Sequence, residues 1–208
     1  SNWNVESLKL GHSMFSFTYF FTGSNVANWK PIKLVVATSM FYRSAIESGL
    51  SGWTTGSIEA ASYFLFHAFN FNDNLVRGSI YTATDGSSNV VWDLTNLTSA
   101  YQFIYTNSFN GDVSNWELPS LVYGASMIHS NTFAGTGVSS WNITKTRGLG
   151  DNNYRGFFTL NNITSAVYSD ILIAWGNQVQ VQGSLLGSTS IDSDTMGGTM
   201  SFAGASET

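Results

Sequence analysis

The chain has 208 residues, a net charge of −5 and 10% charged side chains, against a usual share of about 25% in globular proteins. The negative charge argues against nucleic-acid binding, which needs basic side chains to neutralise phosphates, and the absence of cysteine excludes disulfides and thiolate metal sites. No apolar run approaches the roughly 20 residues of a membrane-spanning helix, so we expect no membrane insertion in this segment.

Internal repetition dominates the pattern from the first residues onward. Tryptophan recurs at intervals of 24 to 26 residues, apart from one interval of 39 and one of 34. In the first five units, Leu or Ile stands five residues after the tryptophan, Gly or Ala eight residues after it, and an apolar pair such as Met40-Phe41 follows. This agreement predicts stacked repeats with tryptophans in a common core. The predicted structural ladder is Trp3, Trp29, Trp53, Trp92, Trp116 and Trp141.

Each unit combines two periodicities. Trp116 and Leu118 are two residues apart, as on one face of a strand, whereas Leu121, Gly124 and Met127 recur every three residues, as on one face of a short helix. The sequence therefore predicts an α/β solenoid, a right-handed leucine-rich-repeat-like coil of about 24–26-residue units. We expect a parallel sheet on one face and short helices or 3-10 turns on the other.

The two longer intervals have local explanations. Residues 78–89 (GSIYTATDGSSN) are rich in turn-forming residues, so we expect an insertion in the third unit. The motif of residues 94–100 recurs in residues 160–166, so a terminal unit is expected to begin at Phe158.

The C-terminal part is expected to close the array. Ile171 and Trp175 fall at helical spacing and predict a capping helix, because the last unit of a solenoid otherwise exposes its core. We therefore divide the chain into repeats over 1–157, with further repeats expected before residue 1, a terminal repeat with its capping helix over 158–175, and a Gly- and Ser-rich extension over 176–208.

A family resemblance follows from these motifs. The segments FNGDVSNW (109–116) and ATSMF (37–41) resemble the BspA-like leucine-rich repeats of bacterial surface proteins, and similar repeats occur in phage and viral proteins. In that family an acidic residue follows the tryptophan, whereas in this chain it does so only at Asp93 and Glu117. The resemblance implies a surface-exposed protein used in adhesion or binding, and it carries no catalytic residues.

Candidate binding residues flank the ladder tryptophans, where strand alternation is expected to turn their side chains outward. They would form a polar, mildly acidic strip that is either a contact surface or simply a solvated face. The strip consists of Asn4, Lys30, Thr54, Asp93, Glu117 and Asn142 after the tryptophans, and Asn28 and Asn115 before them. Tyrosines outside the ladder are further candidates, because amphipathic Tyr is favoured at interfaces. These are Tyr19, Tyr42, Tyr63, Tyr101, Tyr105 and Tyr123.

No catalytic or metal-binding constellation is expected. His12, His67 and His129 lie in different units, so we interpret them as isolated side chains. The segment beginning at Asp151 resembles the start of a calcium loop, but its twelfth position is Asn162 rather than Glu. We therefore expect no enzymatic activity and no cofactor.

Two functions remain open at this point. The first is adhesion or recognition, with a protein or glycan on a cell or virion surface as the partner. The second is a structural role as a subunit of a virion, fibre or surface layer, in which the same repeats contact other copies of the chain. Both lead us to expect an extracellular, cell-surface or virion-surface location.

Overall fold

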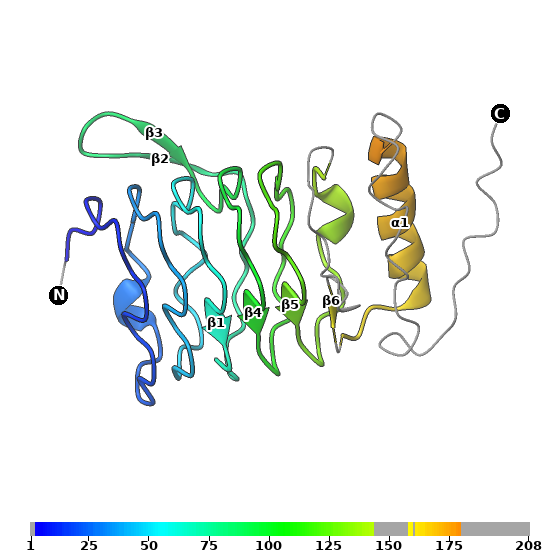
Figure 1. Cartoon of the computed structure of the whole chain (residues 1–208), viewed down its shortest axis with the longest axis horizontal. Helices are drawn as coiled ribbons and strands as arrows, with labels where there is room; N and C mark the ends of the chain where they lie inside the picture. The colour runs from blue at the N-terminus through cyan, green and yellow to red at the C-terminus, as the bar shows by residue number, and fades with distance from the viewer. Residues whose placement is uncertain (1–2, 144–157, 160, 180–208) are drawn as a thin grey trace.

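The computed structural model describes residues 3–143, 158–159 and 161–179. Within these residues the backbone passes through successive coils that lie side by side in one row (Figure 1). The N-terminal coil lies at one end of the row and the helix α1 (Ser165–Val179) at the other.

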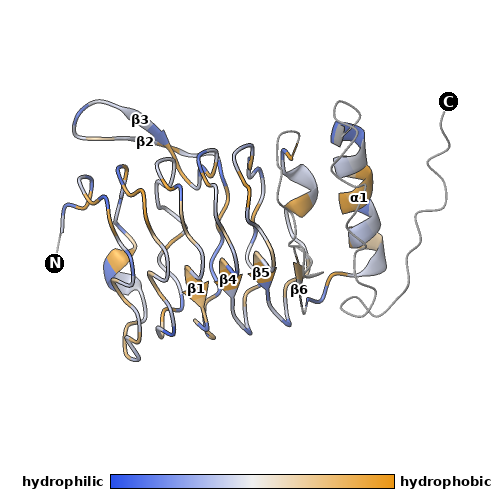
Figure 2. Cartoon of the chain, viewed as in Figure 1, coloured by the Kyte–Doolittle hydropathy of each residue, from blue (hydrophilic) through white to orange (hydrophobic). Residues whose placement is uncertain are grey.

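Parallel pairing joins each coil to the next. One sheet contains, in spatial order, β1 (Leu65–Phe66), β4 (Ile104–Tyr105), β5 (Ile128–His129) and β6 (Phe158–Thr159). A second row of isolated parallel bridges runs through Leu10, Val36, Ala60, Ser99 and Tyr123. Figure 2 shows hydrophobic residues at the four strands. The two rows fix the register of neighbouring coils.

The sheet lies in the half of each coil for which the spacing predicts a helix. β5 contains Ile128, at the end of the Leu121–Ile128 pattern, and the described coils have no helix at that position. Short 3-10 helices instead precede two of the tryptophans, as η1 (Ser24–Val26) and η2 (Val138–Ser140). The short helix predicted for that half is therefore wrong in the described coils, while beside the tryptophans one isolated parallel bridge joins Glu117 to Asn142.

Two consecutive tight turns account for the misleading spacing. Backbone hydrogen bonds of 3.1 and 3.2 Å close the turns over residues 37–40 and 41–44. Their third residues, Ser39 and Arg43, have φ values of 56° and 53°, which is the left-handed conformation that a type II turn requires there. The first and last residues of each turn are buried and the left-handed residue is not. Apolar residues consequently recur every three to four positions without a helix.

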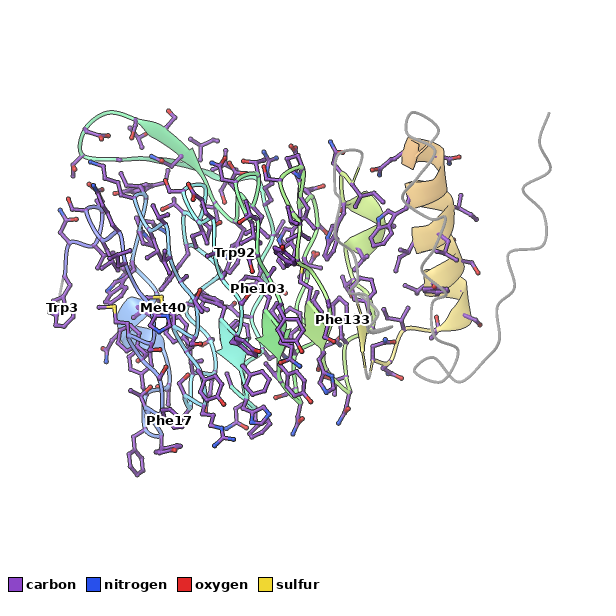
Figure 3. The ribbon with its side chains drawn as sticks, in the orientation of Figure 1. Trp3, Phe17, Met40, Trp92, Phe103 and Phe133 are labelled. Atoms are coloured by element: carbon purple, nitrogen blue, oxygen red, sulfur yellow. The ribbon has the colours of Figure 1, made fainter. Side chains whose placement is uncertain are left out.

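The ladder tryptophans are stacked through the core. Trp92 and Trp141 lie on either side of Trp116, with ring centroids 6.1 and 5.0 Å from it, and all three are almost completely buried. Phe103 packs against the same row at 6.3 Å from Trp116, and Figure 3 shows it among the interior side chains. Trp3 differs, because 61% of its surface is exposed at the N-terminal end.

A repeated hydrogen bond accompanies the stack. The Trp53 indole donates to the carbonyl of Val26, three residues before Trp29 in the preceding coil, at 2.9 Å. Trp141 donates in the same way to Val113, at 2.7 Å. Corresponding bonds join Trp92 to Leu50, Trp116 to Leu75 and Trp175 to Val138. Each bond satisfies a buried indole N–H and ties one coil to the one before it.

An antiparallel hairpin occupies the segment where the sequence predicts an insertion. Its strands are β2 (Ile80–Thr82) and β3 (Ser88–Val90), and it extends back along the row toward the N-terminal coil (Figure 1). The hydroxyls of Thr84 and Tyr81 donate to the Glu6 carboxylate. These bonds, that of Thr84 first, lower the pKa of Glu6. The hairpin thus bridges the third coil and the first.

The helix α1 lies where the spacing of Ile171 and Trp175 predicts one, and it covers the last described coil. Trp175 stacks on Trp141 with ring centroids 6.1 Å apart, and both Ile171 and Trp175 are buried. The Gln178 side chain donates to the Trp141 carbonyl at 2.7 Å and accepts from the Ile143 N–H at 2.9 Å. The helix therefore extends the tryptophan row by one ring.

Some expectations fall on residues that the structure does not describe. They include the calcium-like segment at Asp151 and residues 180–208 of the predicted extension. Among the described residues, no helix is long and apolar enough to cross a membrane.

The tryptophan row makes a direct prediction for stability. Trp116→Ala removes a fully buried ring and leaves the Leu75 carbonyl without its donor, so we expect a loss of about 3–5 kcal/mol in the free energy of unfolding, measured with urea. The matched control Trp3→Ala removes a largely exposed ring and should cost less than about 1 kcal/mol. Equal losses in the two variants would mean that the row is not the core.

Candidate functional site

The strip predicted beside the tryptophans is not a uniform polar face. Asn4, Asn28, Asn115 and Asn142 are exposed, and Lys30, Asp93 and Glu117 are partly buried. Thr54 contradicts the expectation outright, since 0% of its surface is exposed. Its backbone forms an antiparallel bridge with Val91, where the chain returns from the hairpin, and the insertion therefore buries this position.

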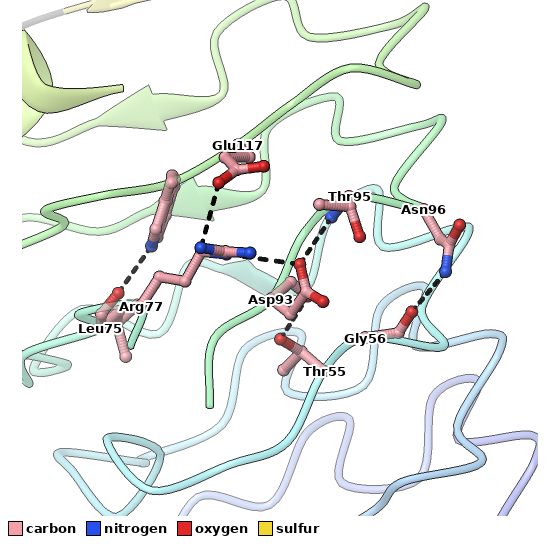
Figure 4. A network of polar contacts seen from close by, with 9 residues as sticks. Thr55, Gly56, Leu75, Arg77, Asp93, Thr95, Asn96 and Glu117 are labelled. Atoms are coloured by element: carbon pink, nitrogen blue, oxygen red, sulfur yellow. Dashed lines mark hydrogen bonds and ion pairs between the residues drawn. The ribbon is translucent and has the colours of Figure 1, made fainter. Parts of the chain in front are cut away.

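The acidic members of the strip are paired within the chain. Arg77 places its Nε 3.5 Å from Asp93 Oδ1 and its Nη1 3.1 Å from Glu117 Oε1 (Figure 4). Asp93 also accepts the Thr95 N–H at 3.2 Å, and its carbonyl accepts the Thr55 hydroxyl at 2.7 Å. These partly buried carboxylates therefore join neighbouring coils and are not free to meet a ligand. Arg77 lies just before the insertion, outside the repeating pattern, and was not predicted.

Lys30 likewise has partners inside the chain. Its ammonium donates to the Gly52 carbonyl and lies 5.7 Å from the centre of the Tyr81 ring, on the hairpin. Burial lowers the pKa of Lys30. Together with the Glu6 contacts, this pair holds the hairpin against the first coils. Much of the predicted strip is thus occupied by structural contacts.

A row of aromatic side chains lies on the strands instead. Tyr42, Phe66, Tyr105 and His129 occupy the same position in four consecutive coils, and Phe66, Tyr105 and His129 belong to β1, β4 and β5. Successive ring centroids are 5.1, 4.7 and 3.7 Å apart. Figure 1 shows these strands on the side of the row opposite the hairpin. The sequence contained this signal, since each residue directly follows the buried apolar pair of its unit.

A second column runs beside the first. Phe17, Arg43 and His67 occupy the third position of equivalent turns, with left-handed φ values of 59°, 53° and 59°. A side chain in this conformation costs about 1–2 kcal/mol that glycine would avoid. The chain nevertheless keeps three large side chains there, and Figure 3 shows Phe17 projecting from the edge of the stack. We call the two columns together the aromatic belt. It consists of Phe17, Tyr42, Arg43, Phe66, His67, Tyr105 and His129.

The belt brings together two histidines that the sequence suggests are isolated. His129 lies parallel to the Tyr105 ring at 3.7 Å, and His67 lies 5.3 Å from the same ring. Burial, followed by the charge of His67, lowers the pKa of His129 to about 4. Burial and the nearby Arg43 lower the pKa of His67. The interpretation of these two histidines as isolated is therefore wrong, and both rings stack in the neutral form at pH 7.

The described residues contain no group of three or more His, Asp or Glu side chains that could hold a metal ion.

Five of the six candidate tyrosines lie at or beside the belt. Tyr42 and Tyr105 belong to it, and Tyr63 contacts both Phe66 and Tyr101 with ring centroids 5.3 Å apart. Tyr19 is largely exposed and contacts Phe17 edge-on, with ring centroids 6.4 Å apart. Tyr123 is exposed and lies outside the belt.

The N-terminal end of the row forms a third feature. Trp3, Leu10 and Phe20 are exposed there, Phe20 to 98%. A shallow, mostly apolar pocket opens beside them. It is lined by Trp3, Phe15, Phe21, Asn25, Val26 and Trp29. This end therefore presents apolar surface that the other end covers with α1.

Comparison with known proteins identifies one family. The model of a family described as "Mycoplasma protein of unknown function, DUF285" matches residues 1–81 and again residues 81–152. The two consecutive matches cover more than half of the chain. No curated protein and no solved structure matches it.

The pKa of His129 predicts how stability depends on pH. In the folded chain this pKa is about 4, against about 6.5 when unfolded, so the unfolded chain binds more protons between these values. The free energy of unfolding should therefore fall as the pH is lowered from 6.5 to 4. Urea unfolding at pH 4.5 and 7 measures the difference in the free energy of unfolding between the two pH values. His129→Phe keeps an aromatic ring but removes the titrating group, so it should reduce that difference. The same acid sensitivity in that variant would assign the effect to other groups.

Proposed function

This chain belongs to the DUF285 family, described for Mycoplasma proteins, and we propose that it is a non-enzymatic, surface-exposed recognition protein that binds its partner through the aromatic belt. The belt carries this proposal because it combines half-buried aromatic rings with one arginine on a rigid, hydrogen-bonded scaffold. Aromatic and arginine side chains supply most of the binding energy at protein interfaces.

We also propose that the repeats are of the BspA-like, leucine-rich type and form a right-handed solenoid outside a cell. The parallel rows between consecutive coils and the tandem family match support this proposal. In such an arrangement five consecutive coils each contribute one or two belt residues, so the contact surface grows with the number of coils. The partner in this proposal is a protein or glycan on another surface.

The recognition proposal predicts adhesion that depends on the belt. Beads coated with the full chain should attach to cultured epithelial cells. The double variant Phe17→Ser with Tyr42→Ser should lower attachment several-fold, because it removes the exposed ring of Phe17 and the partly buried ring of Tyr42. The matched control is Ile80→Ser with Ile173→Ser, which removes two exposed apolar side chains away from the belt. Attachment no better than that of albumin-coated beads, or equal losses in both double variants, would refute the proposal.

A second candidate function is assembly with other copies of the chain through exposed apolar side chains, which include Leu10 and Phe20. Exposed apolar surface marks contact sites when it is contiguous. Light scattering of the full chain distinguishes the two functions. Recognition predicts a monomer, whereas a defined oligomer that Leu10→Ser with Phe20→Ser disperses would favour a structural subunit.

A further inference from the structure

The belt carries one fixed charge, and that charge has no carboxylate partner. The Arg43 guanidinium lies 5.6 Å from the centre of the Tyr42 ring and 6.0 Å from that of Phe17. Both ion pairs among the described residues belong to Arg77, on the other side of the coils. Arg43 is exposed, and cation–π contacts hold it in place without neutralising it. The belt itself contains no acidic residue, although the whole chain is acidic.

The stacking of the rings determines which part of them a ligand meets. Tyr42 and Phe66 are stacked within 12° of parallel and Tyr105 and His129 within 6°, whereas Phe66 and Tyr105 are tilted by 39°. Within the two stacked pairs the rings cover one another's faces and present their edges outward. Aromatic faces carry partial negative charge and aromatic edges partial positive charge. The exposed rims therefore reinforce the attraction of Arg43 for anionic oxygen atoms, and the covered faces are unsuited to stacking against neutral sugar rings.

The backbone under the belt is already hydrogen-bonded between coils. The Arg43 N–H donates to the Phe66 carbonyl at 2.8 Å, and the His67 N–H donates to the Tyr105 carbonyl at 2.7 Å. A peptide cannot add to this surface as a strand, because strand addition needs free backbone groups. The surface offers a straight row of side chains, one step per coil. A linear polymer that binds through its own substituents fits such a row.

We propose that the aromatic belt binds a linear anionic polysaccharide, with its carboxylate or sulfate groups placed against Arg43 and the exposed ring edges. This inference rests on the proposed recognition function and names the class of its ligand. Arg43 supplies the charge-assisted hydrogen bonds, and its planar fork suits both carboxylate and sulfate oxygens. Tyr42 and Tyr105 add hydroxyl groups along the row.

His67 makes the binding dependent on pH. It faces Arg43 from the preceding coil, Phe66 and Phe69 from its own coil, and Tyr105 and His129 from the next two. A bound anion offsets the charge of Arg43 and favours protonated His67. Affinity should therefore rise as the pH falls from 7.5 to 5.5, and His67→Gln should weaken that dependence.

The test measures binding of the full chain to four immobilised polymers at low and high salt. The polymers are heparin, polygalacturonate, dextran and poly-glutamate. We expect retention on heparin, polygalacturonate or both, a loss of affinity with salt, and little binding to neutral dextran or to the acidic peptide. Arg43→Gln should weaken binding about tenfold, as expected for losing a charge-assisted contact of roughly 1.4 kcal/mol. Arg43→Lys should restore part of the affinity.

The control Lys33→Gln removes the same charge from an exposed position outside the belt. Equal weakening by Lys33→Gln and Arg43→Gln would reduce the effect to net charge and overturn the inference, provided that circular dichroism shows both variants folded. Binding to poly-glutamate as strong as to the polysaccharides would also overturn it. Attachment of coated beads to cells without binding to either anionic polysaccharide would reject the polysaccharide and leave the recognition function standing.

Discussion

The hydrogen bond from a tryptophan indole to the coil before it is the constraint on which the rest of the structure depends, and it recurs at Trp53, Trp92, Trp116, Trp141 and Trp175. The acceptor is the carbonyl three residues before the preceding tryptophan at Val26, Leu50, Val113 and Val138. A buried indole N–H without an acceptor costs free energy, so this donor selects one register among many that would bury the ring equally well. Stacking supplies the apolar contact and the hydrogen bond supplies the alignment. With the register fixed, the side chains on the strands form straight columns.

The insertion shows how strictly this constraint holds. By the same three-residue spacing, the acceptor for Trp116 would be the carbonyl of residue 89. The Trp116 indole instead donates to the carbonyl of Leu75, which precedes the hairpin. The repeat thus continues across the insertion in space although it is interrupted in sequence. A hairpin between Leu75 and Trp92 therefore leaves the indole hydrogen bonds of Trp92 and Trp116 in place.

Much of the core was predictable from the sequence, and the belt was not. The tryptophan ladder, the inserted segment and the C-terminal helix follow from spacing alone, because burial imposes a repeating pattern. The positions of strand and helix did not follow, since left-handed residues such as Ser39 and Arg43 produce the three-residue spacing of a helix from paired turns. The prediction of an acidic contact strip was wrong for another reason. Arg77, outside the repeat, pairs with Asp93 and Glu117, and only three-dimensional proximity reveals such a partner.

The hairpin changes the way in which the row of coils can open. In a simple stack each coil contacts only its neighbours, so the terminal coil can detach alone and the ends fray first. Here the bonds from Tyr81 and Thr84 to Glu6 connect the first coil directly to a segment that leaves the third. Detaching the first coil therefore also releases the hairpin. The first three described coils are therefore coupled into one cooperative unit.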